Sequence, residues 1–494
     1  MYIMICLRSY RIGWVFSFFL ICNSLIINGY CQSKPNIIII LADDLGYGDL
    51  SCYGQQQFST PNIDKLAKEG SMYTNFYAGA TVCAPSRAAL LTGLHNGHNS
   101  VRGNQPFPQM LGDEPTIASL LKQNGYETGL IGKWGVGHPQ PVGDPQRCGF
   151  QYSFGYLNMW HAHNFYPEFL YENDKKYLLP GNKLLPVNEW TNNSWVGKPE
   201  NAPEGFGEAK IKGQYVPDEM ETKALDFITR NKSKPFFLFY TPTIPHANNE
   251  IKLNGMEVPS YGIYSGKNWP DVEKGFVSSI IKLDQTIKRI REHLLEEGID
   301  KNTLIIFTSD NGPHNEGGHK ADFFTSSGIY RGTKRDLYEG GIRVPMIACW
   351  PGVITPGTTT NEPYSQIDFL ATACDIASVK MIPKTDGVSL LPSFQNKKEN
   401  QRKHKYLYWE FYESGGRQAV LQYPWKLIKL NTTTYSQNGK TELYNLELDP
   451  REIHDVSAKN LKKVKKLKKL MKEAHVPHPQ MSLFSPKPGQ AGKI

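Results

Sequence analysis

The chain has 494 residues, 39% of them apolar, with ordinary contents of glycine and proline. A chain of this size and composition can bury a large core, which excludes an intrinsically disordered protein and favours one large domain with a smaller appendage. Its 55 basic residues outnumber its 47 acidic residues. This charge weakly favours anionic partners, but no nucleic-acid-binding motif accompanies it.

The N-terminus has the pattern of a signal peptide. Two arginines precede an apolar stretch from Ile12 to Ile27, and Gly29–Cys31 offers a cleavage site before Gln32. The apolar stretch is too interrupted for a stable membrane span, and Asn28 makes a lipid anchor on Cys31 the weaker alternative. We therefore expect residues 1–31 to be removed and the protein to be exported, to a periplasm or out of the cell.

Four β-branched or aromatic runs alternate with helical patterns and end in polar side chains. This predicts an α/β fold with a mostly parallel sheet that helices cover on both faces. In such sheets ligands bind beyond the carboxyl ends of the strands, so the polar residues should meet at one rim. The runs, each with the residues that follow it, are Asn36–Ala42 with Asp43 and Asp44, Thr128–Gly132 with Lys133, Pro235–Tyr240 with His246, and Thr303–Ser309 with Asp310 and Asn311.

A cysteine opens the run CAPSRAALLTG at Cys83–Gly93. The proline and serine that follow it mark a helix start, where free backbone N–H groups attract an anion. A buried cysteine at a helix start is by itself more often inert packing than a reactive group. The other cysteines of the mature chain are too scattered for a disulfide framework or a zinc site, and they are Cys52, Cys148, Cys349 and Cys374.

The acidic strand ends indicate a site for a hard cation. Asp43, Asp44, Asp310 and Asn311 supply only oxygen ligands, which suits Ca²⁺ or Mg²⁺ and not zinc. Simple capping of a strand end is the competing interpretation of the paired aspartates.

Two loops dense in histidine are candidates for substrate recognition. Aromatic faces stack on the C–H surfaces of sugars, while imidazoles donate and accept hydrogen bonds with hydroxyls. Metal binding is the competing interpretation, but no histidine pair has a convincing helical ligand spacing. The candidates are Trp160, His161 and His163 in the first loop, and His319 in the second loop, His314–His319.

From about residue 400 the sequence pattern changes from alternating strands and helices to short strands. Short runs at 405–412, 417–421, 425–430 and 442–446, separated by turn residues, predict an antiparallel sheet. A helix follows, with Leu461, Val464, Leu467 and Met471 at helical spacing and eight lysines between 459 and 472 on its remaining face. We interpret it as a docked helix with a solvated basic side, and a polyanion-binding patch is the alternative. The predicted domains are 32–399 and 400–494.

Two motifs together resemble the signatures of the formylglycine-dependent sulfatases, the type I, arylsulfatase-like branch of the alkaline phosphatase superfamily. They are Cys83–Gly93 and YRGTKRDLYEGGIRVP at Tyr330–Pro345. The resemblance covers nearly the whole mature chain and implies an alkaline-phosphatase-like α/β domain with a small C-terminal α+β domain. It also implies that a maturation enzyme oxidises Cys83 to formylglycine (3-oxoalanine), whose hydrate is the nucleophile.

The resemblance implies a role for each polar residue at the expected rim. One Ca²⁺ would be held by Asp43, Asp44, Asp310, Asn311 and the formylglycine oxygen of residue 83. This ion and the basic side chains would stabilise the charge of the transition state. Among the side chains near it, Arg87 would hold the hydrated aldehyde, Lys133 would contact the sulfate, Lys334 would bind the sulfate and help protonate the leaving oxygen, and His246 would be a general acid.

The chain departs from the family at one position. Many members carry GKWHLG, whereas this chain has GKWGVG at Gly132–Gly137, with Gly135 in place of the histidine and His138 three positions later. The missing histidine would take a proton from the sulfated hemiacetal, so that sulfate is eliminated and the aldehyde restored. His138 is our candidate for this base, because an imidazole with a pKa of about 6.5 suits proton transfer, and His319 is the next candidate.

The expected function is that of an exported, calcium-dependent sulfatase acting on a sulfated saccharide, such as a galactose or N-acetylgalactosamine sulfate in a glycan. A small aryl ester is the weaker alternative substrate. A phosphatase or phosphonate monoester hydrolase on the same scaffold is the enzymatic alternative. A non-catalytic sulfoglycan-binding protein, motivated by Gly135, is the alternative from another class. The sequence leaves the oligomeric state open.

Overall fold

The structure of the chain is a computed structural model that describes residues 34–104, 114–137, 144–191, 204–380, 384–433, 439–479 and 481–484. The predicted signal peptide and His138 lie outside these residues. The chain from Pro35 onward forms one unit. Within the described ranges, no helix combines the length and the apolar character that crossing a membrane requires.

A ten-stranded mixed sheet forms the centre of this unit. Strand β1 (Asn36–Ala42) lies between β10 (Phe236–Thr241) and β11 (Thr303–Ser309) and is parallel to both. Beyond β10 come β4 (Glu127–Lys133) and β5 (Tyr152–Tyr156), also parallel. The edges are β12 (Met346–Cys349), β2 (Ser71–Tyr73) and β13 (Thr358–Thr360) on one side, and β6 (Phe169–Glu172) and β7 (Lys175–Leu178) on the other. The prediction of a mostly parallel α/β sheet is confirmed.

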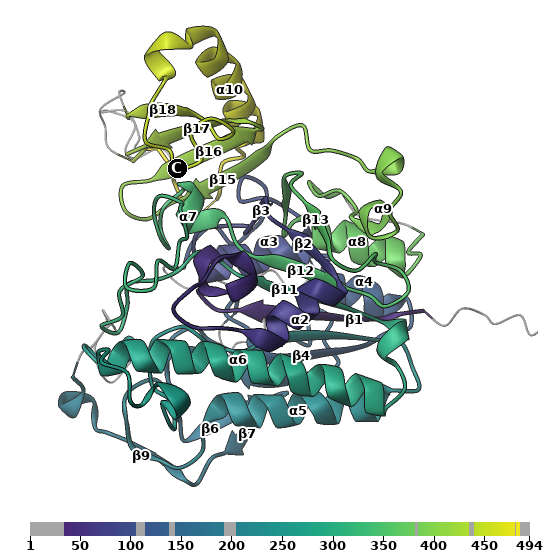
Figure 1. Cartoon of the computed structure of the whole chain (residues 1–494), viewed down its shortest axis with the longest axis vertical. Coiled ribbons are helices and arrows are strands. Elements are labelled where there is room, and N and C mark those ends of the chain that lie inside the picture. The colour runs from purple at the N-terminus through teal and green to yellow at the C-terminus, as the bar shows by residue number, and fades with distance from the viewer. Residues whose placement is uncertain are drawn as a thin grey trace, which may run out of the picture. The chain divides into compact units, whose positions relative to one another are not determined.

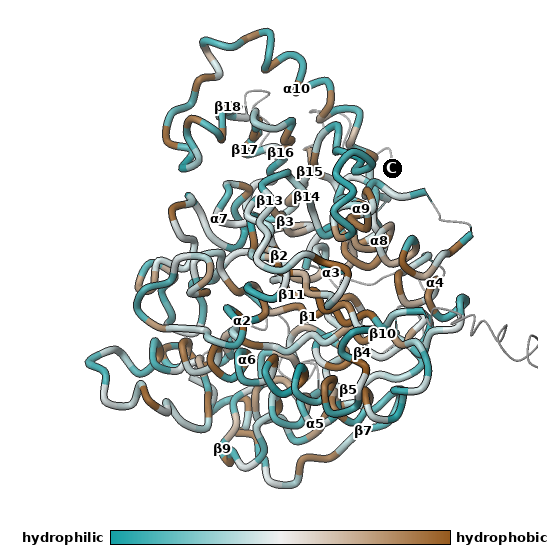
Figure 2. Tube along the Cα trace, turned by 45° about the vertical axis from the view of Figure 1, so that its right-hand side comes forward, coloured by the Kyte–Doolittle hydropathy of each residue, from teal (hydrophilic) through white to brown (hydrophobic). Residues whose placement is uncertain are grey.

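The central strands are apolar along their whole length because both faces of the sheet are covered. Ile38 and Ile40 of β1 pack into one core, whereas Ile37, Ile39 and Leu41 pack into the other. The first core includes α2 (Pro61–Glu69), α5 (Val216–Asn231) and α6 (Asp271–Glu296). The second includes α3 (Cys83–Thr92), α4 (Ile117–Gln123) and α8 (Asp368–Ile376). Figure 1 shows α5 and α6 on one side of the sheet and α8 on the other, and Figure 2 shows the hydrophobic residues along the strands between them.

The C-terminal residues form the predicted antiparallel sheet and helix, at the top of Figure 1. Its strands pair in chain order as β15 (Leu407–Phe411), β16 (Arg417–Gln422), β17 (Trp425–Leu430) and β18 (Thr441–Asn445). Helix α10 (Leu461–Ala474) buries Leu467 and Met471 against this sheet. Leu461, expected on the same apolar face, is 72% exposed, because the packed face begins farther along the helix. The domain boundary at residue 400 stays a prediction.

The remaining elements are short. They are the strands β3 (Phe76–Tyr77), β8 (Asn182–Leu184), β9 (Ala209–Lys212) and β14 (Tyr364–Ser365), and the helices α7 (Glu339–Ile342) and α9 (Leu391–Phe394). Helix α7 lies in the second motif and contacts the C-terminal sheet, because Lys426 of β17 pairs with Glu339 at 2.8 Å between side chains that are both fully buried. The segment that carries Lys334 is thereby anchored to both sheets.

Candidate active site

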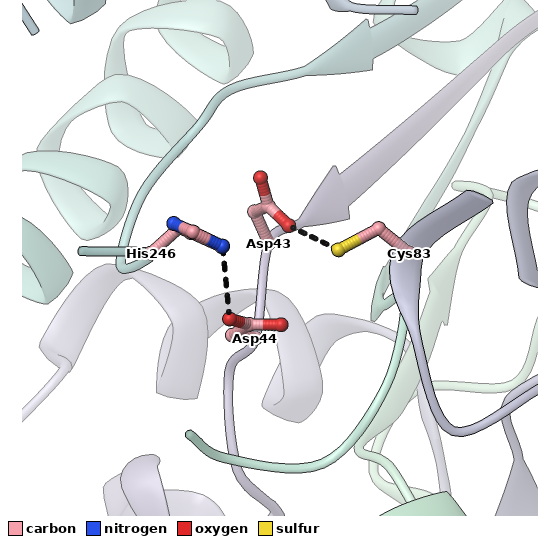
Figure 3. Close-up of side chains that lie close together, drawn as sticks. All are labelled: Asp43, Asp44, Cys83 and His246. Atoms are coloured by element: carbon pink, nitrogen blue, oxygen red, sulfur yellow. Dashed lines mark hydrogen bonds and ion pairs between the residues drawn. The ribbon is translucent and has the colours of Figure 1, made fainter. Parts of the chain in front are cut away.

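The polar residues at the predicted strand ends meet in one buried cluster. Asp43 and Asp44 follow β1, and His246 follows β10. Figure 3 shows Asp43 and Asp44 between Cys83 on one side and His246 on the other. The ligand atoms of these four residues all lie within 4.8 Å of one another. The convergence expected from the parallel sheet is therefore present.

Cys83 is the first residue of α3 and is buried. Its Sγ lies 3.6 Å from Asp43 Oδ1. Burial raises the pKa of the Cys83 thiol well above its usual value, although Lys133 opposes the shift. The group is therefore a protonated thiol, which is a poor nucleophile.

Each aspartate of the cluster is bound by a buried cation. Because a carboxylate buried without a partner would be costly, these contacts favour the ionised form of each acid. Burial would raise the pKa of Asp43, but the nearby charges, first that of Lys133 and then that of Arg87, hold it below its usual range. The contacts are Lys133 Nζ to Asp43 Oδ2 at 2.8 Å, Lys334 Nζ to Asp44 Oδ2 at 2.8 Å, and Arg87 to Asp310 Oδ2 at 2.8 and 3.1 Å from Nη2 and Nε.

The oxygen atoms of the cluster fit a hard cation. Asn311 donates from Nδ2 to Asp44 Oδ1 at 2.7 Å, yet its Oδ1 is buried and has no hydrogen-bond partner in the described part of the chain. Burial and the charge of Asp43 raise the pKa of Asp310 to about 7, so more positive charge would stabilise its ionised form. An orphaned amide oxygen beside three crowded carboxylates is the donor set that Ca²⁺ prefers.

Lys334, His246 and Glu316 form the opposite side of the cluster. Lys334 Nζ lies 3.3 Å from His246 Nε2 and 3.1 Å from Glu316 Oε2. His246 Nδ1 lies 2.6 Å from the carbonyl oxygen of Ala247, and a carbonyl only accepts, so Nδ1 carries the proton. Burial and the charge of Lys334 lower the pKa of His246 to about 3. Nε2 is therefore an unprotonated acceptor, and Lys334 holds the proton on this side.

Glu316 is the functional residue that the sequence reasoning missed. It lies in the histidine-rich loop His314–His319. Its carboxylate contacts two basic side chains, Lys334 through Oε2 and Arg335, whose Nη1 is 2.6 Å from Glu316 Oε1. An isolated glutamate in a glycine-rich loop is usually a solvated charge. Only the basic pair Lys334-Arg335 in the second motif could have suggested a buried acidic partner.

The four residues predicted to bind the substrate make different contacts and do not form one group. His163 stacks on His246, with ring centroids 4.9 Å apart, and its Nδ1 lies 3.7 Å from Glu250 Oε1. His161 is fully buried with its Nε2 3.0 Å from the carbonyl oxygen of Phe169, and Trp160 packs with Phe206. His319 donates from Nδ1 to Glu273 Oε2 at 2.6 Å and stacks on the ring of Phe276. The structure therefore brings only His163, of these four, to the described active-site cluster, and their substrate roles stay predictions.

Gly135 lies directly beside the basic part of the cluster. Its φ is +71°, and a Cβ at this position would lie 3.4 Å from Arg87 Cδ and 3.5 Å from Lys133 Cε. A side chain here would therefore reach the site where the family's histidine is expected. His138, our candidate for its replacement, lies outside the described residues, so its role stays a prediction.

The sequence is similar to known families and proteins. A family model described as Sulfatase matches residues 35–379, and one described as N-sulphoglucosamine sulphohydrolase, C-terminal, matches residues 328–476. An N-acetylgalactosamine-6-O-sulfatase of Bacteroides thetaiotaomicron is 31% identical over 500 residues, covering 88% of this chain and 91% of the relative. Human arylsulfatase A is 33% identical over 398 residues, covering 76% of this chain and 70% of the relative.

Two solved structures extend the likeness to the fold. The structure of Ps i-CgsB in complex with k-i-k-neocarrahexaose has a TM-score of 0.72 and 28% identity, and covers 92% of this chain and 95% of its own. A structure described under the metabolism of multiple glycosaminoglycans by Bacteroides thetaiotaomicron has a TM-score of 0.72 and 29% identity, and covers 89% of this chain and 99% of its own.

Proposed function

The chain belongs to the sulfatase family of the alkaline phosphatase superfamily and is a sulfuric ester hydrolase. From this premise we propose that it removes 6-sulfate groups from galactose or N-acetylgalactosamine residues of a sulfated glycan. The N-acetylgalactosamine-6-O-sulfatase that aligns with 88% of the chain supports this sugar class. The proposal includes export by the leader at residues 1–31, conversion of Cys83 to formylglycine by a maturation enzyme, and one bound calcium ion.

The observation that carries the proposal is that Cys83 shares one buried cluster with three cations. Cys83 contacts Asp43, and the cations Lys133, Arg87 and Lys334 are bound to Asp43, Asp310 and Asp44 respectively. These three cations face three aspartates, so a divalent cation would make the site net positive. A positive, water-poor site suits a sulfate ester, which is an anion whose oxygens gain negative charge during attack on sulfur.

Two groups would complete the site. Formylglycine at position 83 supplies, as its hydrate, a hydroxyl nucleophile that the protonated thiol cannot replace. A calcium ion, held by Asp43, Asp44, Asp310 and Asn311, supplies positive charge against the sulfate oxygens. The chain's own residues orient these groups: the Arg87 guanidinium bridges Asp310 and the carbonyl oxygen of Lys133 at 2.8 Å, which fixes its position against residue 83.

The contacts of Lys334 support a role for it as the donor of the leaving-group proton. Its ammonium donates to Asp44 and Glu316 and faces the Nε2 lone pair of His246. The two carboxylates keep Lys334 charged, while neutral His246 accepts from it and fixes its direction. We therefore propose that Lys334 gives a proton to the departing sugar oxygen, and that His246 positions Lys334 in place of the general-acid role first expected of it.

A panel of esters tests the proposed substrate. We expect the matured enzyme to release sulfate from N-acetylgalactosamine 6-sulfate and galactose 6-sulfate faster than from the 4-sulfated isomers, and to cleave the matching phosphate esters poorly, because a dianion adds charge to a site arranged for a monoanion. Sulfate and phosphate release are measured by ion chromatography. Equal rates on 4- and 6-sulfated sugars would overturn the assignment of the 6-position, and cleavage of phosphate esters alone would overturn the reaction.

Replacement of Lys334 by alanine should slow sugar sulfates more than aryl sulfates. A sugar alkoxide needs a proton to depart, and loss of a positioned acid costs about a hundredfold or more, whereas nitrophenolate leaves without one. We expect the rate on N-acetylgalactosamine 6-sulfate to fall by that factor and the rate on nitrophenyl sulfate to fall much less. Lys320→Ala is the control variant, because Lys320 is an exposed lysine that directly follows the loop His314–His319, which carries Glu316. An equal loss on both esters would assign Lys334 to sulfate binding alone.

A further inference from the structure

A second concave, basic site lies on the C-terminal sheet. Helix α10 packs across β16 and β17, and beside this contact is a cleft of about 310 Å³. Strands β16, β17 and β18, the C-terminal half of α10 and Phe484 line it, and no residue of the active-site cluster takes part. The residues that the argument uses are Lys429, Lys468, Lys472, His475, Thr441 and Phe484.

The lysines of this cleft are not neutralised. Lys429, Lys468 and Lys472 make no ion pair with a carboxylate within the described ranges, whereas Lys469 on the same helix pairs with Glu473 at 3.8 Å. Burial, and then the charge of Lys468, lower the pKa of Lys429, so the two ammonium groups repel each other across the cleft. Cations gathered in a concave surface without acids attract an anionic ligand.

The wall of the cleft also suits a sugar. Phe484 lies against Lys429, with 5.2 Å between the ammonium and the ring centroid, and His475 packs edge-on at 5.1 Å. His475 Nδ1 is fixed by Glu410 at 2.6 Å. An aromatic face for C–H groups, with Thr441 as a hydroxyl partner, supplies the contacts that sugar rings use.

We propose that this cleft, formed by Lys429, Lys468, Lys472 and Phe484, is a second binding site that holds a sulfated glycan chain on the C-terminal sheet while its sulfate esters are cleaved in the active site. The proposal rests on the proposed function, because a sulfated polymer is the polyanion with sugar rings that such an enzyme meets. It divides the basic face of α10 into a binding part and a solvated part.

Two triple variants, each of which removes three positive charges, distinguish the binding part of this face from its solvated part. The first replaces Lys429, Lys468 and Lys472 with alanine. The second replaces Lys462, Lys465 and Lys466, which are exposed on the same helix and do not line the cleft. In each, Cys83→Ala prevents turnover, and binding of polymeric chondroitin 6-sulfate is measured by calorimetry at two salt concentrations, with desulfated chondroitin as the control ligand.

We expect the cleft variant to lose about tenfold in affinity, because each of three exposed ion pairs contributes roughly two- to threefold, and to show a weaker salt dependence. The other triple variant should stay within about twofold of the parent. In enzyme with Cys83 intact, the cleft variant should raise KM for the polymer and leave kcat and the hydrolysis of monosaccharide sulfates unchanged.

Equal losses in the two triple variants would overturn the proposal, since general charge would then explain the binding. Unchanged affinity in the cleft variant, or tighter binding of single-stranded DNA than of the sulfated polymer at equal salt, would also overturn it. A failure of the proposed function is a separate observation, because it would show as absent hydrolysis of monosaccharide sulfates by the parent enzyme.

Discussion

Replacing Cys83 with alanine is expected to reduce sulfate release by about ten-thousandfold or more, the scale of loss when an enzyme's nucleophile is removed. The physical reason is that residue 83 provides the attacking oxygen only after oxidation, and the buried, protonated thiol has no other chemistry to offer. The side chain is small, and in the described part of the chain its Sγ makes a single, long hydrogen bond, at 3.6 Å to Asp43. The fold should therefore lose no more than about 1 kcal/mol.

Cys374→Ala is the matched control for this variant. Cys374 is another buried cysteine, which lies on α8, packs in the second core and takes no part in the active-site cluster, so its replacement should lower stability without affecting catalysis. Mass spectrometry of the peptide that contains Cys83, from active enzyme, should show loss of sulfur and gain of an aldehyde. Full activity from protein whose Cys83 is an intact thiol would refute the nucleophile assignment.

The strand ends of the site were predictable because a buried parallel strand has a simple sequence pattern. Asn36–Ala42 and Thr303–Ser309 are continuous apolar runs bounded by polar residues, and the structure has β1 and β11 over the same bounds. Parallel strands place their carboxyl ends at one rim. The meeting of Asp43, Asp44, Asp310 and Asn311 therefore follows from the pattern together with the fold class.

The loop residues were not predictable in the same way, because the direction of a loop side chain depends on what packs around it. His161 and His163 are two residues apart, yet one is fixed by the carbonyl oxygen of Phe169 and the other stacks on His246. In the second loop Glu316 reaches Lys334, while His319 pairs with Glu273 of α6. Both loops are dense in histidine, and tertiary contacts decide which of their residues reach the site.

The basic helix shows a similar limit. Its lysines are equivalent in sequence, and a solvated face was the simpler interpretation. Packing of Leu467 and Met471 on the sheet rotates α10 so that Lys468 and Lys472 border the cleft beside Lys429. Which lysines of α10 border the cleft depends on the position of β17, about 40 residues earlier in the chain. The periodicity of the helix carries no information about that strand.

Replacing Asp310 is expected to remove both the metal and the activity, with a loss of about a thousandfold or more, because the ion and the arginine that Asp310 orients both stabilise transition-state charge. The alanine variant should also be less stable by about 3 kcal/mol, since the fully buried Arg87 would lose its 2.8 Å contact with Asp310 and keep the longer 3.6 Å contact with Asp43. Asp310→Asn retains the shape and separates the two effects: it should lose calcium affinity with a smaller loss of stability.

Asp284→Asn is the control for the Asp310 variants, because Asp284 is a buried carboxylate that accepts from the backbone N–H groups of Asn62 and Ile63 at 2.9 and 2.8 Å, at the start of α2. It should lower the free energy of unfolding and leave calcium content unchanged. Calcium is measured by elemental mass spectrometry after dialysis, and stability by denaturant unfolding. Full calcium content in Asp310→Ala would show that this side chain is not a ligand. If activity were lost while calcium was retained, the role of Asp310 would be to position Arg87. Asp310 would then act through the Arg87 guanidinium, which lies 2.8 Å from its carboxylate.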